Sequence, residues 1–88
     1  MKFEFDGFKS ASNQVKHGID FLAAQALWDD PDFIETPAHL SDEPRWRVTG
    51  RINGRLYTAI ITYRGSIIRI ISMRRAHPDE ERLYEQAS

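Results

Sequence analysis

Cysteine is absent from this 88-residue sequence, and histidine occurs only three times. Without cysteine the chain can form neither disulfides nor thiolate metal sites, and a reducing compartment, the cytoplasm, is the default expectation. The histidines are His17, His39 and His77, and no pair has the close spacing that would place two imidazoles on one metal ion. We therefore predict neither a bound metal nor a cofactor.

Long apolar runs, phosphate-binding glycine loops and nucleophilic serine motifs are also missing. No stretch approaches the length of a transmembrane helix, and acidic residues within Met1–Asp6 interrupt the apolar segment that a secretion signal requires. No serine lies in the strand–turn–helix context of a hydrolase nucleophile. We expect a protein that is neither exported nor bound to a membrane, and that performs neither nucleotide-driven nor acyl-transfer chemistry.

The composition is that of one small globular domain. Apolar residues make up 41% of the chain and charged residues 28%, which is enough for a packed core, and the length leaves room for a single domain over residues 1–88. The net charge of −1 gives no global attraction for nucleic acid. Nine of the twelve basic residues are arginines that all lie from Arg45 to Arg82, so a local positive field remains possible.

Local patterns in the first half predict a short strand followed by two helices. Phe3 and Phe5 alternate with charged residues, as in a strand. A first helix is expected from Phe8 to His17, with Gly18 as the residue that ends it.

The second helix should cover Phe21–Trp28. Asp20 precedes this apolar segment as a candidate N-cap, and Pro31 follows it. Residues 29–44 are rich in Asp, Pro, Ser and Thr, and we interpret them as a loop that contains one short edge strand.

From Arg45 onward the pattern changes to three antiparallel strands. Asn53-Gly54 and Gly65-Ser66 are favoured two-residue hairpin turns, which predict strands over Arg45–Ile52, Arg55–Arg64 and Ile67–Arg75. Pro78 then opens a closing helix through Tyr84. The predicted class is α+β: two N-terminal helices pack on one face of a mainly antiparallel sheet, and a short helix closes the chain.

The two turns also predict which side chains share a face of the sheet. If each turn is a strict two-residue loop, residue 52 lies opposite 55 and residue 64 opposite 67. One face is then largely apolar and should pack on the two helices; it receives Trp46, Val48, Gly50, Ile52, Tyr57, Ala59, Ile61, Tyr63, Ile68 and Ile70, and Arg74 by the same alternation. The opposite face mixes arginines, threonines and some apolar residues; it receives Arg45, Arg47, Thr49, Arg51, Thr58, Ile60, Thr62, Arg64, Arg69, Ile71, Met73 and Arg75. A bulge in either hairpin would change this assignment.

Three arginines should converge at one end of the second face. In the strict register Arg45, Thr62 and Arg69 form a row, and Arg64 lies diagonally beside Arg69. Guanidinium groups bind phosphate through paired, charge-assisted hydrogen bonds, so an anion such as an RNA backbone is a candidate ligand. The alternative is that these are solvated strand residues paired with the acids at positions 29, 30, 42 and 43.

Other single residues allow both a functional and a structural interpretation. His17, after Lys16 at the end of the first helix, could transfer protons near neutral pH, or its charge could simply stabilise the helix terminus. Tyr84 could direct its hydroxyl toward the arginine face, or it could anchor the last helix. Trp28 and Trp46 could stack on bases, although packing in a small core is the commoner role of such residues.

Several motifs resemble the BrnT family of toxins. Residues 13–24 read Asn13-x-x-Lys16-His17-Gly18-Ile19-x-Phe21-x-x-Ala24, which is similar to the family block N-x-x-K-H-G-[IV]-x-F-x-x-A. Phe3-Glu4-Phe5-Asp6 precedes it where members often show F-E-W-D, so Phe5 replaces Trp. The second half is similar through Arg45, Gly50-Arg51-x-x-Gly54-Arg55, Tyr63-Arg64-Gly65, Ile68-Arg69-Ile70-Ile71-Ser72-x-Arg74-x-Ala76 and Glu81-Arg82-Leu83-Tyr84, whose single intervening residue departs from the pattern. The likeness runs from about Phe3 to Tyr84.

This resemblance implies a RelE-like fold and a metal-independent ribonuclease toxin that slows translation. It also implies neutralisation by a ribbon-helix-helix, BrnA-like antitoxin, which would link the complex to operator DNA. Arg64 and Arg69 are then expected to bind phosphate and stabilise the transition state, with His17 or Lys16 transferring protons. Arg45, Arg74 and Tyr84 are further candidates for substrate binding.

Two other classes of function are alternatives to the nuclease. A non-catalytic module could use the arginine face to receive an acidic segment of a partner protein. A direct DNA-binding regulator is disfavoured, because the net charge is close to zero and no recognition helix is apparent.

Overall fold

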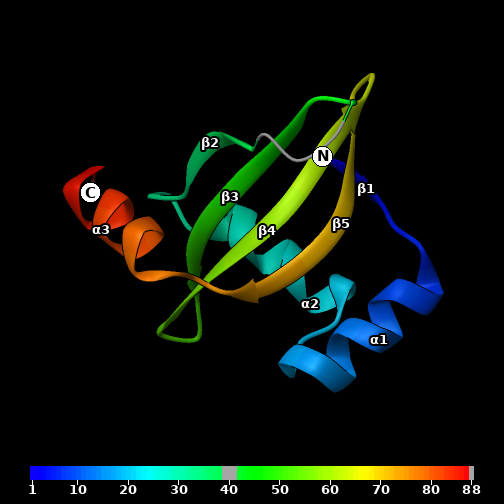
Figure 1. The fold of residues 1–88 in the computed structure, drawn as a ribbon, viewed down its shortest axis with the longest axis horizontal. Helices are drawn as coiled ribbons and strands as arrows, with labels where there is room; N and C mark the ends of the chain where they lie inside the picture. Colours follow the sequence, from blue (N-terminus) through cyan, green and yellow to red (C-terminus); the bar gives the residue numbers. More distant parts are fainter. Residues whose placement is uncertain (39–41, 88) are drawn as a thin grey trace.

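The computed structural model describes residues 1–38 and 42–87 (Figure 1). In chain order the elements are β1 (Lys2–Glu4), α1 (Gly7–His17), α2 (Phe21–Ala24), the 3-10 helix η1 (Gln25–Asp29), β2 (Ile34–Ala38), β3 (Arg45–Ile52), β4 (Arg55–Arg64), β5 (Ile67–Arg75) and α3 (Pro78–Ala87). The α+β class is confirmed. His39 lies outside the described residues.

The strands form one five-stranded sheet in the order β1-β5-β4-β3-β2. β1 runs parallel to β5, and the other neighbours are antiparallel, so the sheet is mainly antiparallel as predicted. The three central strands have the predicted bounds, because the turns between them are the expected ones. Asn53 and Gly54 have φ values of 50° and 80°, as a type I′ turn requires, and Gly65 has a φ of 61°.

One irregularity in the β4–β5 pairing changes the predicted faces. Ile61 lies opposite Ile70, as the strict register requires, but Ile60 lies opposite Ser72, so Ile71 is an extra residue in a β-bulge. Beyond the bulge the alternation reverses. Met73 is therefore in the core, and Arg74 lies opposite Thr58 on the other face.

The faces predicted for Met73, Arg74 and Arg75 are consequently wrong. The prediction assumed an unbulged ladder, whereas the extra residue moves each of the three to the opposite side. Arg75 now lies opposite Tyr57, and its guanidinium carbon is 5.6 Å from the centroid of that ring.

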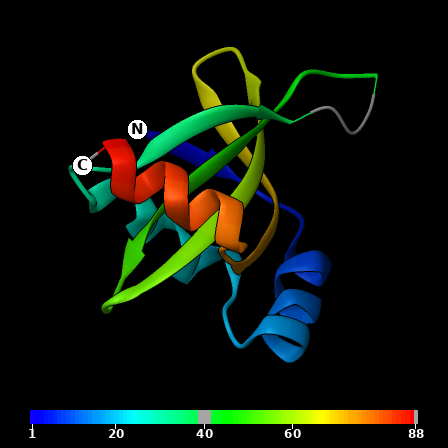
Figure 2. The same cartoon turned by 60° about the vertical axis from the view of Figure 1, so that its left-hand side comes forward.

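The sheet lies between two layers of helix, with α2 and η1 on one side and α3 on the other (Figure 2). Phe21, Ala24 and Leu27 of α2 and η1 are almost fully buried against the apolar face, where Val48, Ala59, Ile61, Ile70 and Met73 complete the core. The single helix predicted over residues 21–28 is thus a short α-helix continued as a 3-10 helix. Its N-cap is the predicted one, since Asp20 Oδ1 accepts a hydrogen bond from Ala23 N at 2.8 Å.

α1 packs along the edge of the sheet. β1 pairs only with Ile67–Arg69 of β5, and α1 lies beside the later part of that strand (Figure 1). The buried residues of α1 are polar, Ser10 and Asn13. The expectation that both N-terminal helices cover the apolar face is corrected: α2 and η1 provide the apolar cover, and α1 closes the edge.

The contacts of Ser10 and Asn13 explain this position. Asn13 Oδ1 accepts a hydrogen bond from the edge amide Met73 N at 3.2 Å, and its Nδ2 donates to Ile19 O at 2.8 Å. Ser10 Oγ accepts from Phe21 N at 2.9 Å. These bonds pair backbone groups that the edge of β5 and the start of α2 would otherwise leave buried and unsatisfied.

Within the described residues, no helix has both the length and the apolar character needed to cross a bilayer.

Candidate functional site

A small basic pocket lies between α1 and β5. It has a volume of about 220 Å³ and is lined by Lys9, Ser12, Asn13, Lys16, His17, Phe21, Ile71 and Ser72. The described residues that line it include no carboxylate, so its charge is positive when the lysines are protonated. The pocket joins two of the predicted site residues, Lys16 and His17, to the bulged part of β5.

Local sequence explains why these two side chains lie there. α1 ends at Gly18, which has a φ of 75° and donates its N–H to Gln14 O. Lys16 and His17 therefore occupy the last turn, where positive charge is favoured by the helix dipole. Both side chains are exposed.

Arg69 lies on the same strand, two residues before Ile71, which is about 7 Å along an extended chain. Its Nη1 forms an ion pair with Glu4 Oε2 at 2.6 Å, and both side chains remain about one-third exposed. The parallel pairing of β1 with β5 places these two residues directly opposite each other. Arg69 of the predicted arginine cluster therefore has a carboxylate partner other than the acids considered from the sequence. Glu4 is 65 residues away in the chain, and strand pairing brings it to Arg69.

Arg64 is exposed at the end of β4, opposite Ile67, and Thr62 lies opposite Arg69. The predicted diagonal arrangement of Arg64 and Arg69 is thus the observed register. Arg45 begins β3, and its buried Nε has no hydrogen-bond acceptor among the described residues.

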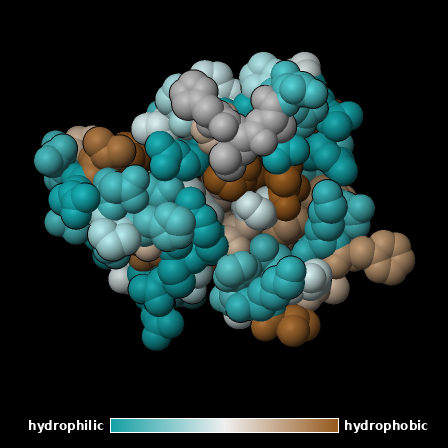
Figure 3. Space-filling view, viewed as in Figure 1, coloured by the Kyte–Doolittle hydropathy of each residue, from teal (hydrophilic) through white to brown (hydrophobic). Residues whose placement is uncertain are grey.

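We call Arg64, Arg69, Lys9, Lys16 and His17 the basic strip. It follows β5 from the hairpin turn to α1. Figure 3, in the orientation of Figure 1, shows a hollow in which apolar atoms lie between hydrophilic side chains. An extended anion could contact both the arginine end and the α1 end of such a surface.

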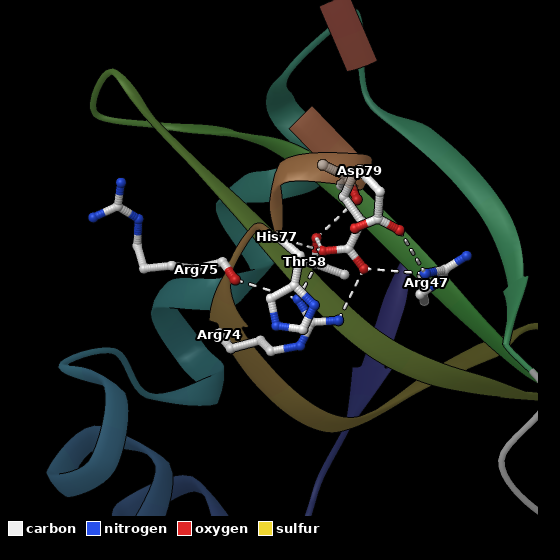
Figure 4. A network of polar contacts seen from close by, with 8 residues as sticks. Arg47, Thr58, Arg74, Arg75, His77 and Asp79 are labelled. Carbon is white, nitrogen blue, oxygen red and sulfur yellow. Dashed lines mark hydrogen bonds and ion pairs between the residues drawn. The ribbon is translucent and has the colours of Figure 1, made fainter. Parts of the chain in front are cut away.

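A second cluster of charges lies under α3, around Glu80 (Figure 4). Only 2% of the Glu80 residue surface is exposed. Its carboxylate accepts two hydrogen bonds from Arg74, at 2.7 and 2.9 Å, and one from Arg47 at 3.3 Å. Thr58 Oγ1 and His77 N complete the set at 2.9 and 2.8 Å.

The Glu80 carboxylate is ionised at neutral pH. Burial by itself would raise its pKa, but the hydrogen bonds from Arg74, His77 N and Thr58 outweigh burial and lower the pKa to about 2. Arg74 therefore uses both terminal nitrogens of its guanidinium on a structural carboxylate. A phosphate that bound the same two nitrogens of Arg74 would have to compete with Glu80.

Tyr84 is buried at the same helix, and its hydroxyl donates to Asp30 Oδ2 at 2.7 Å. The Arg51 guanidinium lies over the ring, 5.5 Å from its centroid. Burial and the hydrogen bond to Asp30 raise the pKa of Tyr84. These contacts fasten α3 to the segment after η1, which corresponds to the anchoring alternative.

One group of possible metal ligands occurs among the described residues, formed by His77, Asp79 and Glu80, whose ligand atoms lie within 4.8 Å of one another. The Glu80 oxygens already accept from two guanidinium groups. A divalent cation would have to enter beside Arg47 and Arg74, so this group does not suit a metal ion.

Of the predicted site residues, the structure groups Arg64 and Arg69 at one end of the basic strip and Lys16 and His17 at the other. It adds Lys9, which the sequence could have indicated, because Lys9 and Lys16 are two helical turns apart and share a face. It also adds Ser72 to the pocket, which depends on the bulge.

Residues 5–80 match the model of a family described as "Ribonuclease toxin, BrnT, of type II toxin-antitoxin system". The chain belongs to the BrnT toxin family. Membership implies a ribonuclease toxin with an antitoxin partner and an RNA substrate. The matched span contains the whole basic strip and stops before Tyr84. No individually curated protein matches the chain.

Proposed function

We propose that this protein is an endoribonuclease that cleaves RNA without a metal ion, and that the basic strip is its working surface. The observation that carries the proposal is the pocket in which Lys9, Lys16 and His17 converge beside β5, in a chain of a ribonuclease toxin family. The pocket offers proton-transfer groups, and Arg69 on the same strand offers an anion-binding group.

The reaction that suits these groups is attack by the ribose 2′-hydroxyl on the adjacent phosphate. A base removes the 2′ proton, the new 2′-O–P bond forms, and the P–O5′ bond breaks as an acid protonates the leaving oxygen. The products are a 2′,3′-cyclic phosphate and a 5′-hydroxyl. We assign proton transfer to His17 or Lys16, because both are exposed at the pocket.

Arg69 and Arg64 would stabilise the extra negative charge of the phosphorane. A guanidinium can donate two parallel hydrogen bonds to non-bridging phosphate oxygens, and it stays protonated throughout. Glu4 would hold Arg69 in position before substrate binds. Arg45, half-buried at the start of β3, would support the same end of the strip.

We further propose that a ribbon-helix-helix antitoxin neutralises the protein in the cytoplasm and carries the complex to operator DNA. Loss of intact RNA would then inhibit translation. A neighbouring reading frame that encodes a short ribbon-helix-helix protein is the expected genetic context.

The test compares the wild type with Arg64→Ala/Arg69→Ala and Lys16→Ala/His17→Ala after induction in cells and with purified protein. The wild type should arrest growth and fragment RNA into pieces with cyclic phosphate ends, in the presence of EDTA as well. Both double variants should lose these effects at equal expression. Arg82→Ala, an exposed arginine of α3 outside the strip, is the matched control and should behave as the wild type. Intact RNA with every purified protein would exclude catalysis.

A second candidate is a non-catalytic module that binds an acidic protein segment. It is favoured by one observation: Arg69, Arg47 and Arg74 already bind the carboxylates of Glu4 and Glu80. The cleavage test above also distinguishes the two candidate functions, because a non-catalytic module would bind its antitoxin and leave RNA intact.

A further inference from the structure

α1 presents its apolar side chains to solvent. Phe8 is 92% exposed and Val15 is 87% exposed. They are two helical turns apart with exposed Ala11 between them, so the three form a stripe on one face, which we call the α1 stripe. Figure 3 shows apolar side chains projecting at the lower right, over the position of α1 in Figure 1.

The polar face of α1 is the buried one, and it cannot be exchanged for the stripe. Ser10 and Asn13 point inward and bond the backbone at Phe21, Ile19 and Met73. Turning the helix to bury Phe8 would break these bonds and leave buried backbone groups without partners. An amphipathic helix normally buries its apolar face, so cover for this stripe has to come from another molecule.

The charges beside the stripe indicate the chemistry of that molecule. Lys9 and Lys16 lie along one flank, about 100° around the helix from the Phe8 side. α1 contains no aspartate or glutamate. A second copy of the chain, packed with its α1 on this α1, would bring no carboxylate of that helix to Lys9 or Lys16. A partner that supplies carboxylates along one edge of an apolar face fits better.

We infer that the antitoxin covers the α1 stripe with an amphipathic helix, its apolar side chains on Phe8, Ala11 and Val15 and its acidic edge facing Lys9 and Lys16. This inference rests on the proposed function for the identity of the partner. Because Lys9 and Lys16 also line the pocket, the same helix closes the α1 end of the basic strip. Neutralisation is then occlusion of the site by a helix held on the stripe next to it.

The test uses the purified product of the neighbouring antitoxin gene and the full-length toxin. Phe8→Ser/Val15→Ser should weaken antitoxin binding at least 100-fold in calorimetry, because both anchors of the stripe are lost. Ala11→Arg places a bulky charge at the centre of the stripe and should weaken binding similarly without removing an apolar side chain. Leu83→Ser, a partly exposed leucine of α3, is the matched control and should bind as the wild type.

Cleavage assays distinguish this inference from the proposed function. The stripe variants should cut RNA as fast as the wild type and should resist inhibition by antitoxin. Equal antitoxin affinity of the wild type and both stripe variants would overturn the inference. It is also overturned if the wild type is a dimer in light scattering, the stripe variants are monomers, and antitoxin affinity is unchanged. If binding depends on the stripe but no toxin cuts RNA, the docking site stands and the nuclease proposal fails.

Discussion

At the scale of single residues, Asn13 connects three parts of the molecule. Its amide bonds the edge of β5 and the turn before α2 while belonging to α1. Asparagine suits this position because one short side chain carries both a donor and an acceptor.

Replacing Asn13 with alanine should destabilise the fold by about 2 kcal/mol, because it leaves Met73 N–H and Ile19 C=O buried without partners. Urea unfolding measures this difference. Gln14→Ala changes an exposed neighbour on the same helix and should shift the free energy of unfolding very little. A loss no greater than that of Gln14→Ala would show that water satisfies the two backbone groups.

Glu80 predicts a dependence of stability on pH. Its pKa is about 2 in the folded protein and 4.5 ordinarily, so the folded state favours the ionised form. The stabilisation is present above pH 4.5 and is lost as the pH falls toward 2, and we expect it to be about 3 kcal/mol. In thermal unfolding, Glu80→Gln should be less stable than the wild type at neutral pH. The stabilities of the two proteins should converge in acid.

The control for this prediction is Glu81→Gln on the same helix. It should keep the acid-induced decline of the wild type, since Glu80 and its arginines are intact. A constant gap between Glu80→Gln and the wild type from pH 2 to 6 would show that hydrogen bonding, and not ionisation, makes the contribution.

At the scale of elements, the bulge at Ile71 decides which side of the sheet the end of β5 presents. It lets Met73 enter the core while Arg74 reaches Glu80 on the other face. The bulge also lies beside the α1 pocket, which Ile71 and Ser72 line. One extra residue therefore shapes both the core and the candidate site.

Deleting Ile71 should leave a folded protein, because strict alternation from Ile70 through Ser72 still places Met73 in the core and Arg74 on the side of Glu80. Circular dichroism and limited proteolysis show whether the fold is kept. Ile71→Ala keeps the residue count and should remain folded, with a cost of about 1 kcal/mol for the lost apolar surface. A deletion variant that does not fold, beside an Ile71→Ala variant that does, would show that the bulge itself is needed for the packing of β5.

At the scale of the whole molecule, the net charge of −1 limits how RNA can be bound. In our proposal the attraction for RNA comes from the basic strip, which contains two arginines and two lysines. Each phosphate that a cation neutralises on a single strand contributes about −0.7 to the slope of log K against log salt, so we expect a slope of about −3.

Fluorescence anisotropy with an uncleavable 2′-deoxy oligonucleotide measures this slope. Lys9→Ala should weaken binding and make the slope shallower by the contribution of about one phosphate. Arg82→Ala, outside the strip, should leave the slope unchanged. A slope that is insensitive to Lys9→Ala and to Arg69→Ala would place the RNA elsewhere on the molecule.

Much of the fold and part of the site follow from local sequence. The pairs Asn53-Gly54 and Gly65-Ser66 determine the hairpins, because few residues adopt the positive φ angles that tight turns need. The bounds of β3, β4 and β5 and the diagonal of Arg64 and Arg69 follow from those turns. Lys16 and His17 are placed together by the helix stop at Gly18.

The tertiary structure alone decided the other features. The ion pair of Glu4 with Arg69 needs parallel pairing between strands at opposite ends of the chain, and the bulge at Ile71 is fitted to the packing of Met73. The burial of the polar face of α1 depends on the edge of β5. The backbone amide of Met73 bonds Asn13 there, so Asn13 faces inward and Phe8 faces solvent. Turns and caps are set by neighbouring residues, whereas an ion pair, a bulge and a buried face depend on which distant segments meet and on satisfying their polar groups there.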